Sequence, residues 1–164
     1  MQELQIEGFP DYCIDETGQV TNMNTGHVLA TRQNHQGITM VNLVKGGHQH
    51  TKSLAVLVAK HFLEPHPLPA FDTPIHLDGD KRNCYVDNLM WRPRWFAIRY
   101  HQQFAKDPID IFTEPIICLD TDEIFETPRQ ASIALGVLEL DIVHAIRDQK
   151  GVWPYGYDFR IYKE

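Results

Sequence analysis

The chain has 164 residues, of which 43% are hydrophobic and 23% charged, and its formal net charge is −7 at pH 7. This composition is typical of a folded globular protein, long enough for one sizeable core or for two to three small modules. No apolar run approaches the roughly 20 residues that a membrane helix needs, so the sequence excludes a membrane protein.

The start of the chain and its cysteines indicate the cell interior. Residues 1–7 lack the basic start and apolar block of a secretory signal. Cys13, Cys84 and Cys118 are odd in number, lie far apart and form no C-x-x-C pair. We therefore expect neither a disulfide framework nor a cysteine zinc site, and we expect a cytoplasmic protein.

Charge is unevenly distributed along the chain. Residues 1–70 carry four Lys/Arg against six Asp/Glu, residues 71–106 carry six against four, and residues 107–164 carry five against twelve. Duplex DNA is bound largely through its phosphates, so a DNA-binding surface is usually basic. Only the middle third fits this expectation, and the acidic last third disfavours tight DNA binding there.

Short strands and turns are predicted for residues 6–30. Gly18 and Gly26 each follow a threonine between strand-like stretches, where glycine can take the positive φ of a hairpin turn. This segment resembles the small N-terminal module often fused to phage and intron HNH nucleases, and the resemblance implies such a module at 1–35. The matching positions are Gly8, Phe9, Tyr12, Ile14, Asp15, Gly18, Val20 and Asn22. An ordinary β-meander is the alternative.

Residues 38–45 are rich in strand-forming side chains, and a glycine pair then predicts a turn into a returning strand that begins at His48. Residues 54–62 suit a short helix with its apolar side inward, which the proline-rich stretch after it would end. The spacing of His48 and His50 allows a metal site on one strand face. Without a third ligand of suitable spacing, histidines that face solvent are the better interpretation.

The order and spacing of residues from 57 to 91 resemble the HNH nucleases found among homing endonucleases. The matching positions are Leu57, Val58, Ala59, Phe62, His76, Asp78, Gly79, Lys81, Asn83, Asn88, Leu89 and Trp91. The resemblance implies a ββα-metal (His-Me finger) core at 36–106, with a β-hairpin at about 74–92 and a helix at about 93–105.

In this family, the residue at His76 is the general base, which takes a proton from the water that attacks phosphorus. A neutral imidazole suits that task. The residue at Asn88 orients the base through a side-chain hydrogen bond. A divalent ion, Mg²⁺ in an active enzyme, would stabilise the charge that develops on the phosphate and on the leaving oxygen.

The positions at which this family holds its metal ion are occupied by Ile75 and Ala97. Hard cations need oxygen ligands, and neither side chain offers one. Asp78 and Asp80 carry carboxylates, but we expect them to point away from His76. We therefore assign no metal ligand and no cofactor. His76 is then either a structural histidine of a vestigial site or a base that still works.

Several basic side chains of the middle third are candidates for contacts with DNA phosphates. They are Lys81, Arg82, Arg92, Arg94 and Arg99. A solvated helix face is the alternative for the last three. The neighbouring aromatic residues Trp91, Trp95, Phe96 and Tyr100 are predicted to pack in the core.

The last third is predicted to hold two strands, two helices and a closing strand. The predicted elements are a linker at 107–115, strands at 116–120 and 123–126, helices at 127–136 and 139–149, and an aromatic strand at 153–159. The first helix has clear boundary signals, because Thr127 caps it, a proline and a glutamine follow at favourable places, and Gly136 ends it.

This order resembles the helix-turn-helix DNA-binding repeat that follows many homing endonuclease cores, which implies such a module at 116–164. Matching positions are Ala131, Ala134, Leu135, Gly136, Ile142, Gly156 and Tyr157. The resemblance implies that DNA would be faced by His144, Arg147, Gln149 and Lys150. Asp141 and Asp148 on the same helix would repel phosphate, and protein docking is the alternative use.

The sequence thus predicts an α+β protein of the HNH homing endonuclease family that binds double-stranded DNA and has weakened or lost metal-dependent nicking activity. The alternative is a catalytically dead nuclease fold that binds proteins as a structural or regulatory component, for example of a phage particle or a host complex. As a component of a phage particle, the protein would be associated with a virion. No membrane partner is expected.

Overall fold

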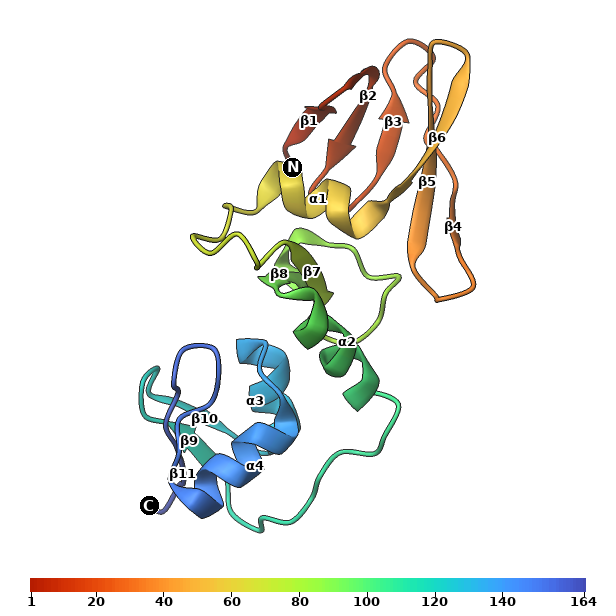
Figure 1. Cartoon of the computed structure of the whole chain (residues 1–164). Coiled ribbons are helices and arrows are strands. Elements are labelled where there is room, and N and C mark those ends of the chain that lie inside the picture. Colours follow the sequence, from red (N-terminus) through yellow and green to blue (C-terminus); the bar gives the residue numbers. More distant parts are fainter. The chain divides into compact units, whose positions relative to one another are not determined.

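The computed structural model describes residues 1–164 and combines four α-helices with several small sheets (Figure 1). None of the helices has the length and apolar character needed to cross a membrane. The chain forms two compact units, Met1–Ala97 and Ile98–Glu164, and each is described by itself.

Two three-stranded antiparallel sheets form the first part of unit 1. The first has the order β1-β2-β3, and the second has the order β4-β5-β6. Their bounds are β1 Glu3–Ile6, β2 Phe9–Asp15, β3 Val20–Asn22, β4 Thr31–Gln33, β5 Thr39–Lys45 and β6 His48–Ser53. Gly18 and Gly26 have φ values of +87° and +71°, which confirms the glycine turns predicted between the strands.

Helix α1 (Leu54–Phe62) lies between the first sheet and the later hairpin and packs against both (Figure 1). Its bounds confirm the helix predicted at 54–62. The buried side chains of α1 join those of the sheets in one core, whose members include Ile14, Leu43, Val58 and Leu89. The segments predicted as separate modules, 1–35 and 36–106, therefore share a hydrophobic core.

A two-stranded hairpin follows, with β7 (Thr73–His76) antiparallel to β8 (Leu89–Arg92) and a 3-10 turn, η1 (Val86–Asn88), just before β8. Helix α2 (Arg94–Gln103) comes next. This confirms the hairpin predicted at 74–92, and the helix is slightly shorter than the predicted 93–105. The boundary between the two units falls inside α2, between Ala97 and Ile98.

Unit 2 contains a three-stranded sheet of order β10-β9-β11 and two helices that pack on each other. The bounds are β9 Ile116–Cys118, β10 Glu123–Phe125, α3 Pro128–Leu135, α4 Glu139–Asp148 and β11 Phe159–Ile161. The Thr127 side chain accepts a hydrogen bond from the Gln130 nitrogen at 3.2 Å, and Gly136 ends α3 with φ +63°. Both boundary signals of the first helix are thereby confirmed.

The aromatic strand predicted at 153–159 is wrong. The strand begins only at Phe159, and the residues before it form a turn closed by backbone hydrogen bonds between Val152 and Tyr157. Gly156 takes φ +74° in that turn. Aromatic residues favour strands only where a neighbouring strand and a half-buried surface are available, and this segment has a turn instead.

Candidate active site and nucleic-acid interface

His76 is the last residue of β7, and the chain turns sharply after it. The Gly79 nitrogen donates to the His76 carbonyl oxygen at 2.9 Å, and Gly79 takes φ +78°. The side chain of His76 is only 5% exposed. Burial lowers its pKa to about 4, against the opposing effect of the Asp78 carboxylate, with further effects from Lys81 and Asp80. The imidazole is therefore neutral at pH 7.

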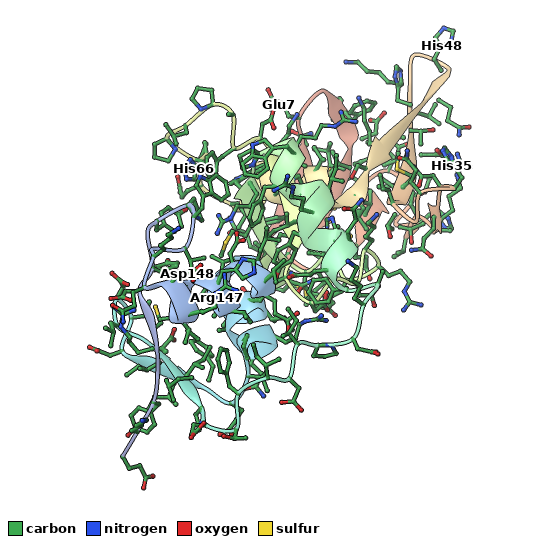
Figure 2. The ribbon with its side chains drawn as sticks, turned by 60° about the horizontal axis from the view of Figure 1, so that its bottom comes forward. Glu7, His35, His48, His66, Arg147 and Asp148 are labelled. Atoms are coloured by element: carbon green, nitrogen blue, oxygen red, sulfur yellow. The ribbon has the colours of Figure 1, made fainter.

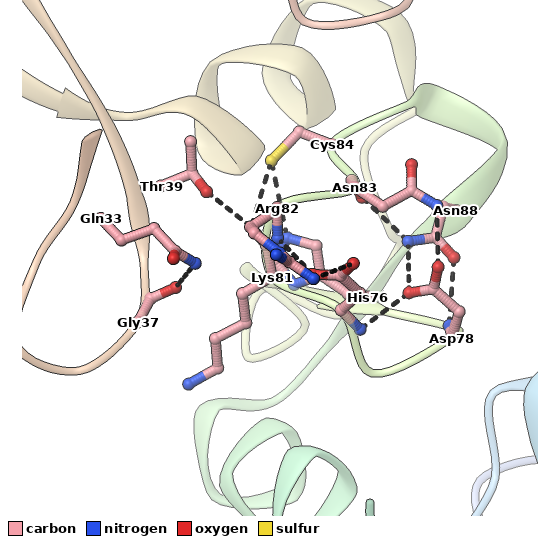
Figure 3. Close-up of polar contacts among 11 residues, drawn as sticks. Gln33, Gly37, Thr39, His76, Asp78, Lys81, Arg82, Asn83, Cys84 and Asn88 are labelled. Carbon is pink, nitrogen blue, oxygen red and sulfur yellow. Dashed lines mark hydrogen bonds and ion pairs between the residues drawn. The ribbon is translucent and has the colours of Figure 1, made fainter. Parts of the chain in front are cut away.

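Asn88 holds the loop after His76 together. Its Nδ2 donates to Oδ1 of Asp78 and to the Asn83 carbonyl oxygen, both at 2.9 Å, and its Oδ1 accepts from the Asp78 nitrogen at 3.0 Å (Figure 3). Both amide hydrogens and the amide oxygen are thus used within the loop. The orienting hydrogen bond from Asn88 to His76 stays a prediction.

The two loop carboxylates are occupied by donors of the loop itself. Asp78 accepts from the Asp80 nitrogen through Oδ1 and from Asn83 Nδ2 through Oδ2, both at 2.8 Å. Asp80 accepts from Arg82 through Nε at 3.0 Å and through a terminal nitrogen at 3.2 Å. These hydrogen bonds lower the pKa of Asp80. A metal ion could bind either carboxylate only by displacing these hydrogen bonds.

The residues around His76 do not fit a divalent cation. Ile75 and Ala97 are both buried and apolar. No group of three or more His, Cys, Asp or Glu side chains in the chain is arranged to hold a metal ion. A hard cation at the family's usual place would meet no protein oxygen from these two residues.

Cys84 lies against His76, a contact that the sequence analysis missed. Its Sγ is 3.7 Å from His76 Nε2 and 3.6 Å from the Lys81 carbonyl oxygen, and the residue is 2% exposed. Burial, together with the charges of Asp80 and Asp78, raises the pKa of the thiol to about 11. The only signal in the sequence is the position of Cys84 at the end of the loop, which says nothing of its neighbour.

Two of the predicted phosphate contacts in unit 1 are engaged in local bonds. Lys81 Nζ donates to the Gln36 carbonyl oxygen at 3.1 Å. The guanidinium of Arg82 forms an exposed, two-pronged ion pair with Asp80. Arg94 is exposed at the start of α2.

Arg92 and Trp95 occupy places that their sequence positions did not predict. Arg92 is 1% exposed, donates to the Trp91 carbonyl oxygen at 2.9 Å and lies over the Phe96 ring at 5.8 Å. The Arg92 side chain thus packs at the junction of β8 and α2, and it is too deeply buried to contact a DNA phosphate. Trp95 is 51% exposed, so its predicted core packing is wrong.

Unit 2 presents its predicted DNA-facing residues on the surface. Exposed residues are Arg99, His144, Arg147, Gln149 and Lys150. Arg147, however, pairs with its neighbour Asp148, from Nε to Oδ1 at 2.8 Å and from a terminal nitrogen to Oδ2 at 2.9 Å (Figure 2). The guanidinium that is best suited to hold a phosphate is thus already paired with a carboxylate.

A buried ion pair that the sequence analysis did not predict holds the segment after α2 in place. Arg129 and Glu139 meet at 2.9 Å, and Arg129 also donates to the carbonyl oxygens of Gln103 and Lys106. Glu139 Oε1 accepts from the Ile109 nitrogen at 2.8 Å. The start of the predicted linker, at Ile109, is therefore bonded to α4, and the residues just before the linker are bonded to α3.

Comparison with known proteins gives a consistent result over the whole chain. No family model matches. The chain is 25% identical to the DNA endonuclease I-HmuI of Bacillus phage SP01 over an alignment of 174 positions, which covers 98% of this chain and 97% of that protein. A solved structure reported as "DNA binding and cleavage by the HNH homing endonuclease I-HmuI" covers 100% of this chain and 99% of its own, with a TM-score of 0.56 and 23% identity.

The chain is thus similar, along its whole length, to an HNH homing endonuclease in sequence and in fold.

Proposed function

We propose that this protein is a DNA-binding member of the HNH homing endonuclease family whose metal-dependent nicking activity is weakened or lost. The observation that carries the proposal is the hairpin that retains His76 while apolar, buried Ile75 and Ala97 stand at the family's metal positions. Nucleic-acid binding draws on many dispersed contacts, whereas metal-assisted hydrolysis needs its few ligands in place.

In this proposal β7, β8 and α2 form a degenerate ββα (His-Me finger) core, and α3 with α4 forms a helix-turn-helix module. The corresponding parts are an N-terminal module at 1–35, the core at 36–106, a linker at 107–115 and the C-terminal module at 116–164. The basic residues proposed to meet DNA are Lys81, Arg82, Arg94, Arg99, His144, Arg147 and Lys150. Arg92 is left out because it is buried.

The loop chemistry supports the loss of the metal. Asp78 and Asp80 are the carboxylates of the loop that follows His76, and rescue of the metal site would have to come from them. Their oxygens already accept hydrogen bonds from the loop and from Arg82. Recruiting either carboxylate would break the bonds that shape the loop.

The direct test is nicking of supercoiled plasmid in Mg²⁺ or Mn²⁺ by the wild type and by His76→Ala, together with duplex binding at several salt concentrations. We expect salt-sensitive binding and little or no nicking. Nicking at a rate common for active nucleases, abolished in His76→Ala, would overturn the proposed loss of activity. Absence of duplex binding at low salt would overturn the DNA-binding part.

A gain-of-function variant tests whether the missing metal ligands cause the proposed loss of nicking. If only the ligands are missing, Ile75→Asp combined with Ala97→Asn restores nicking, and adding His76→Ala to the pair removes it again. Because Ile75 is buried, the folded state of each variant is verified by circular dichroism. A folded double variant without any gain would contradict this account.

A second function has its own support. Residues 107–164 carry five Lys/Arg against twelve Asp/Glu, and Arg147 is paired with Asp148. These features disfavour DNA at unit 2 and favour a protein partner for the nuclease fold in a structural or regulatory role. Loss of both nicking and duplex binding in the plasmid test would support this second function.

A further inference from the structure

The sheet of unit 2 has one face covered by helices and one face turned away from them (Figure 1). Helix α3 contacts β10, and α4 contacts β11. On the covered face, Ile116, Cys118 and Phe159 are fully buried in the same core as residues of α3 and α4. Since successive side chains of a strand point to opposite faces, Ile117 and Leu119 point away from the helices.

The outer face of this sheet is apolar, although the solvent-facing side of an antiparallel sheet is usually polar. Ile117 of β9 lies directly opposite Ile124 of β10. Ile124 is 48% exposed and Leu119 is 47% exposed, and neither they nor Ile117 belong to the core of unit 2. The core of unit 2 therefore does not account for these three side chains, which we call the outer strip.

Carboxylates flank the outer strip. Residues 116–126 contain no Lys or Arg and four exposed acidic residues, which are Asp120, Asp122, Glu123 and Glu126. On the side of β11, the Leu119 nitrogen donates to the Asp158 carbonyl oxygen at 2.9 Å, so Asp158 lies beside the strip. Arg160, which lies opposite Ile117, forms an ion pair with Asp158. This arginine is thus balanced by a carboxylate, and the four acidic residues leave the surroundings of the strip negative.

We propose that the outer strip is a docking site for a short basic segment of another protein. The apolar side chains of that segment cover Ile117, Leu119 and Ile124, and its Lys or Arg side chains pair with the flanking carboxylates. Complementary charge favours encounter with such a segment and disfavours an acidic one. This site goes beyond the proposed function, because the residues of unit 2 proposed to meet DNA lie outside the sheet, on α2, on α4 and just after α4.

Two other occupants conflict with the charge and the size of the outer strip. DNA phosphates would meet carboxylates such as Asp122 and Glu126, and like charges repel. A second copy of this chain, docked through the same face by two-fold symmetry, would bring the two sets of carboxylates together. Three apolar side chains also fall far short of a stable interface between folded domains, which buries about 800 Å² on each partner. A short basic segment meets both constraints.

The test measures binding of three fluorescein-labelled synthetic peptides to the full chain by fluorescence anisotropy at low salt. The first peptide alternates lysine with leucine, the second lysine with serine, and the third glutamate with leucine. We expect the lysine–leucine peptide to bind at least about fivefold more tightly than either of the others, because it alone offers both apolar contact and positive charge. In ¹⁵N NMR of the wild type, this peptide should shift the amide signals of Ile117, Leu119 and Ile124 and not those of α4.

Substitutions then locate the site. Ile124→Ser should weaken binding of the lysine–leucine peptide roughly fivefold, since one half-exposed aliphatic side chain loses its contact. Leu140→Ser on α4 is the matched control, because Leu140 is 51% exposed and lies outside the strip, and it should leave the affinity unchanged. Glu126→Lys should weaken binding roughly threefold, whereas Glu64→Lys, at an exposed position in unit 1, should have a smaller effect.

Three results would overturn the docking site. The first is equal affinity for the lysine–leucine and lysine–serine peptides, or an equal loss in Ile124→Ser and Leu140→Ser. The second is self-association in analytical ultracentrifugation that Ile124→Ser abolishes, which would identify a second copy as the occupant. The third is a loss of duplex binding in Ile124→Ser, which would place DNA at the strip. Absence of duplex binding in the wild type and in every variant, with the peptide results as expected, would count against the proposed function and leave the docking site standing.

Discussion

Asn88 and Asp78 are joined twice, from Asn88 Nδ2 to Asp78 Oδ1 at 2.9 Å and from the Asp78 nitrogen to Asn88 Oδ1 at 3.0 Å. This reciprocal pairing closes the loop that follows His76. A third bond from Asn88 reaches the Asn83 carbonyl oxygen.

Replacing Asn88 with Ala removes all three bonds, one of which involves a carboxylate. We expect the free energy of unfolding to fall by about 2–3 kcal/mol, because hydrogen bonds to charged groups contribute more than neutral ones. Urea denaturation followed by circular dichroism measures this loss. The control is Asp87→Ala, an exposed neighbour, which should change stability by less than about 0.5 kcal/mol. Equal effects of the two substitutions would contradict the assigned role of Asn88.

The pair of Arg147 and Asp148 predicts an effect on DNA affinity. Asp148→Asn removes the carboxylate that pairs with the Arg147 guanidinium. We expect duplex affinity to rise roughly threefold. We also expect affinity to depend more steeply on salt concentration, by the amount that corresponds to about one more neutralised phosphate. Fluorescence anisotropy at several salt concentrations measures both quantities. Asp122→Asn changes the net charge equally at an exposed position in the turn between β9 and β10. The same gain in that variant would mean that bulk charge, not Arg147, sets the affinity.

The buried His76 predicts a dependence of stability on pH. Its pKa is lowered from 6.5 to about 4 by burial, with Lys81 acting in the same direction and Asp78 and Asp80 against it. Between these values the unfolded state binds a proton that the folded state does not. Stability is therefore full above pH 6.5 and falls as the pH drops toward 4, by at most about 3 kcal/mol from this group.

Urea titrations from pH 7.5 to pH 4 measure this dependence. His76→Gln should flatten the curve over that interval, whereas His48→Gln, on an exposed strand, should leave it unchanged. A curve for His76→Gln as steep as that of the wild type would show that other groups cause the acid sensitivity.

The buried pair of Arg129 and Glu139 predicts a structural effect at a distance in sequence. Glu139→Ala leaves the Arg129 guanidinium without its carboxylate and the Ile109 nitrogen without its acceptor. We therefore expect the free energy of unfolding to fall by about 3 kcal/mol. Hydrogen exchange should rise at residues 104–110 before it rises elsewhere in unit 2. The exposed Glu123→Ala on β10 is the control and should alter neither quantity.

Much of the fold could be predicted because its signals are local. The threonine cap at Thr127 and the glycine stop at Gly136 mark α3 in the sequence itself, and the apolar pattern of residues 54–62 marks α1. The family resemblance supplied the hairpin around His76. The closing strand was placed wrongly because aromatic residues favour a strand only in a suitable tertiary context.

The contacts of the candidate site depend on side-chain placement, which no periodicity reveals. Cys84 and His76 are eight positions apart and meet only because the loop between them folds back. The contact of Thr39 with Lys81 spans 42 positions. The identity of Ile75 and Ala97, by contrast, is read directly from the sequence, so the prediction that these two positions offer a metal ion no ligand needs no side-chain placement.

The two hydrogen bonds that join Lys81 to Gln36 and to Thr39 also bear on the order in which the protein folds. They join segments that are 45 and 42 positions apart in the chain. Contacts between distant segments form late, because a long loop must close before they contribute. We therefore expect the second sheet to form before Lys81 docks against Gln36 and Thr39.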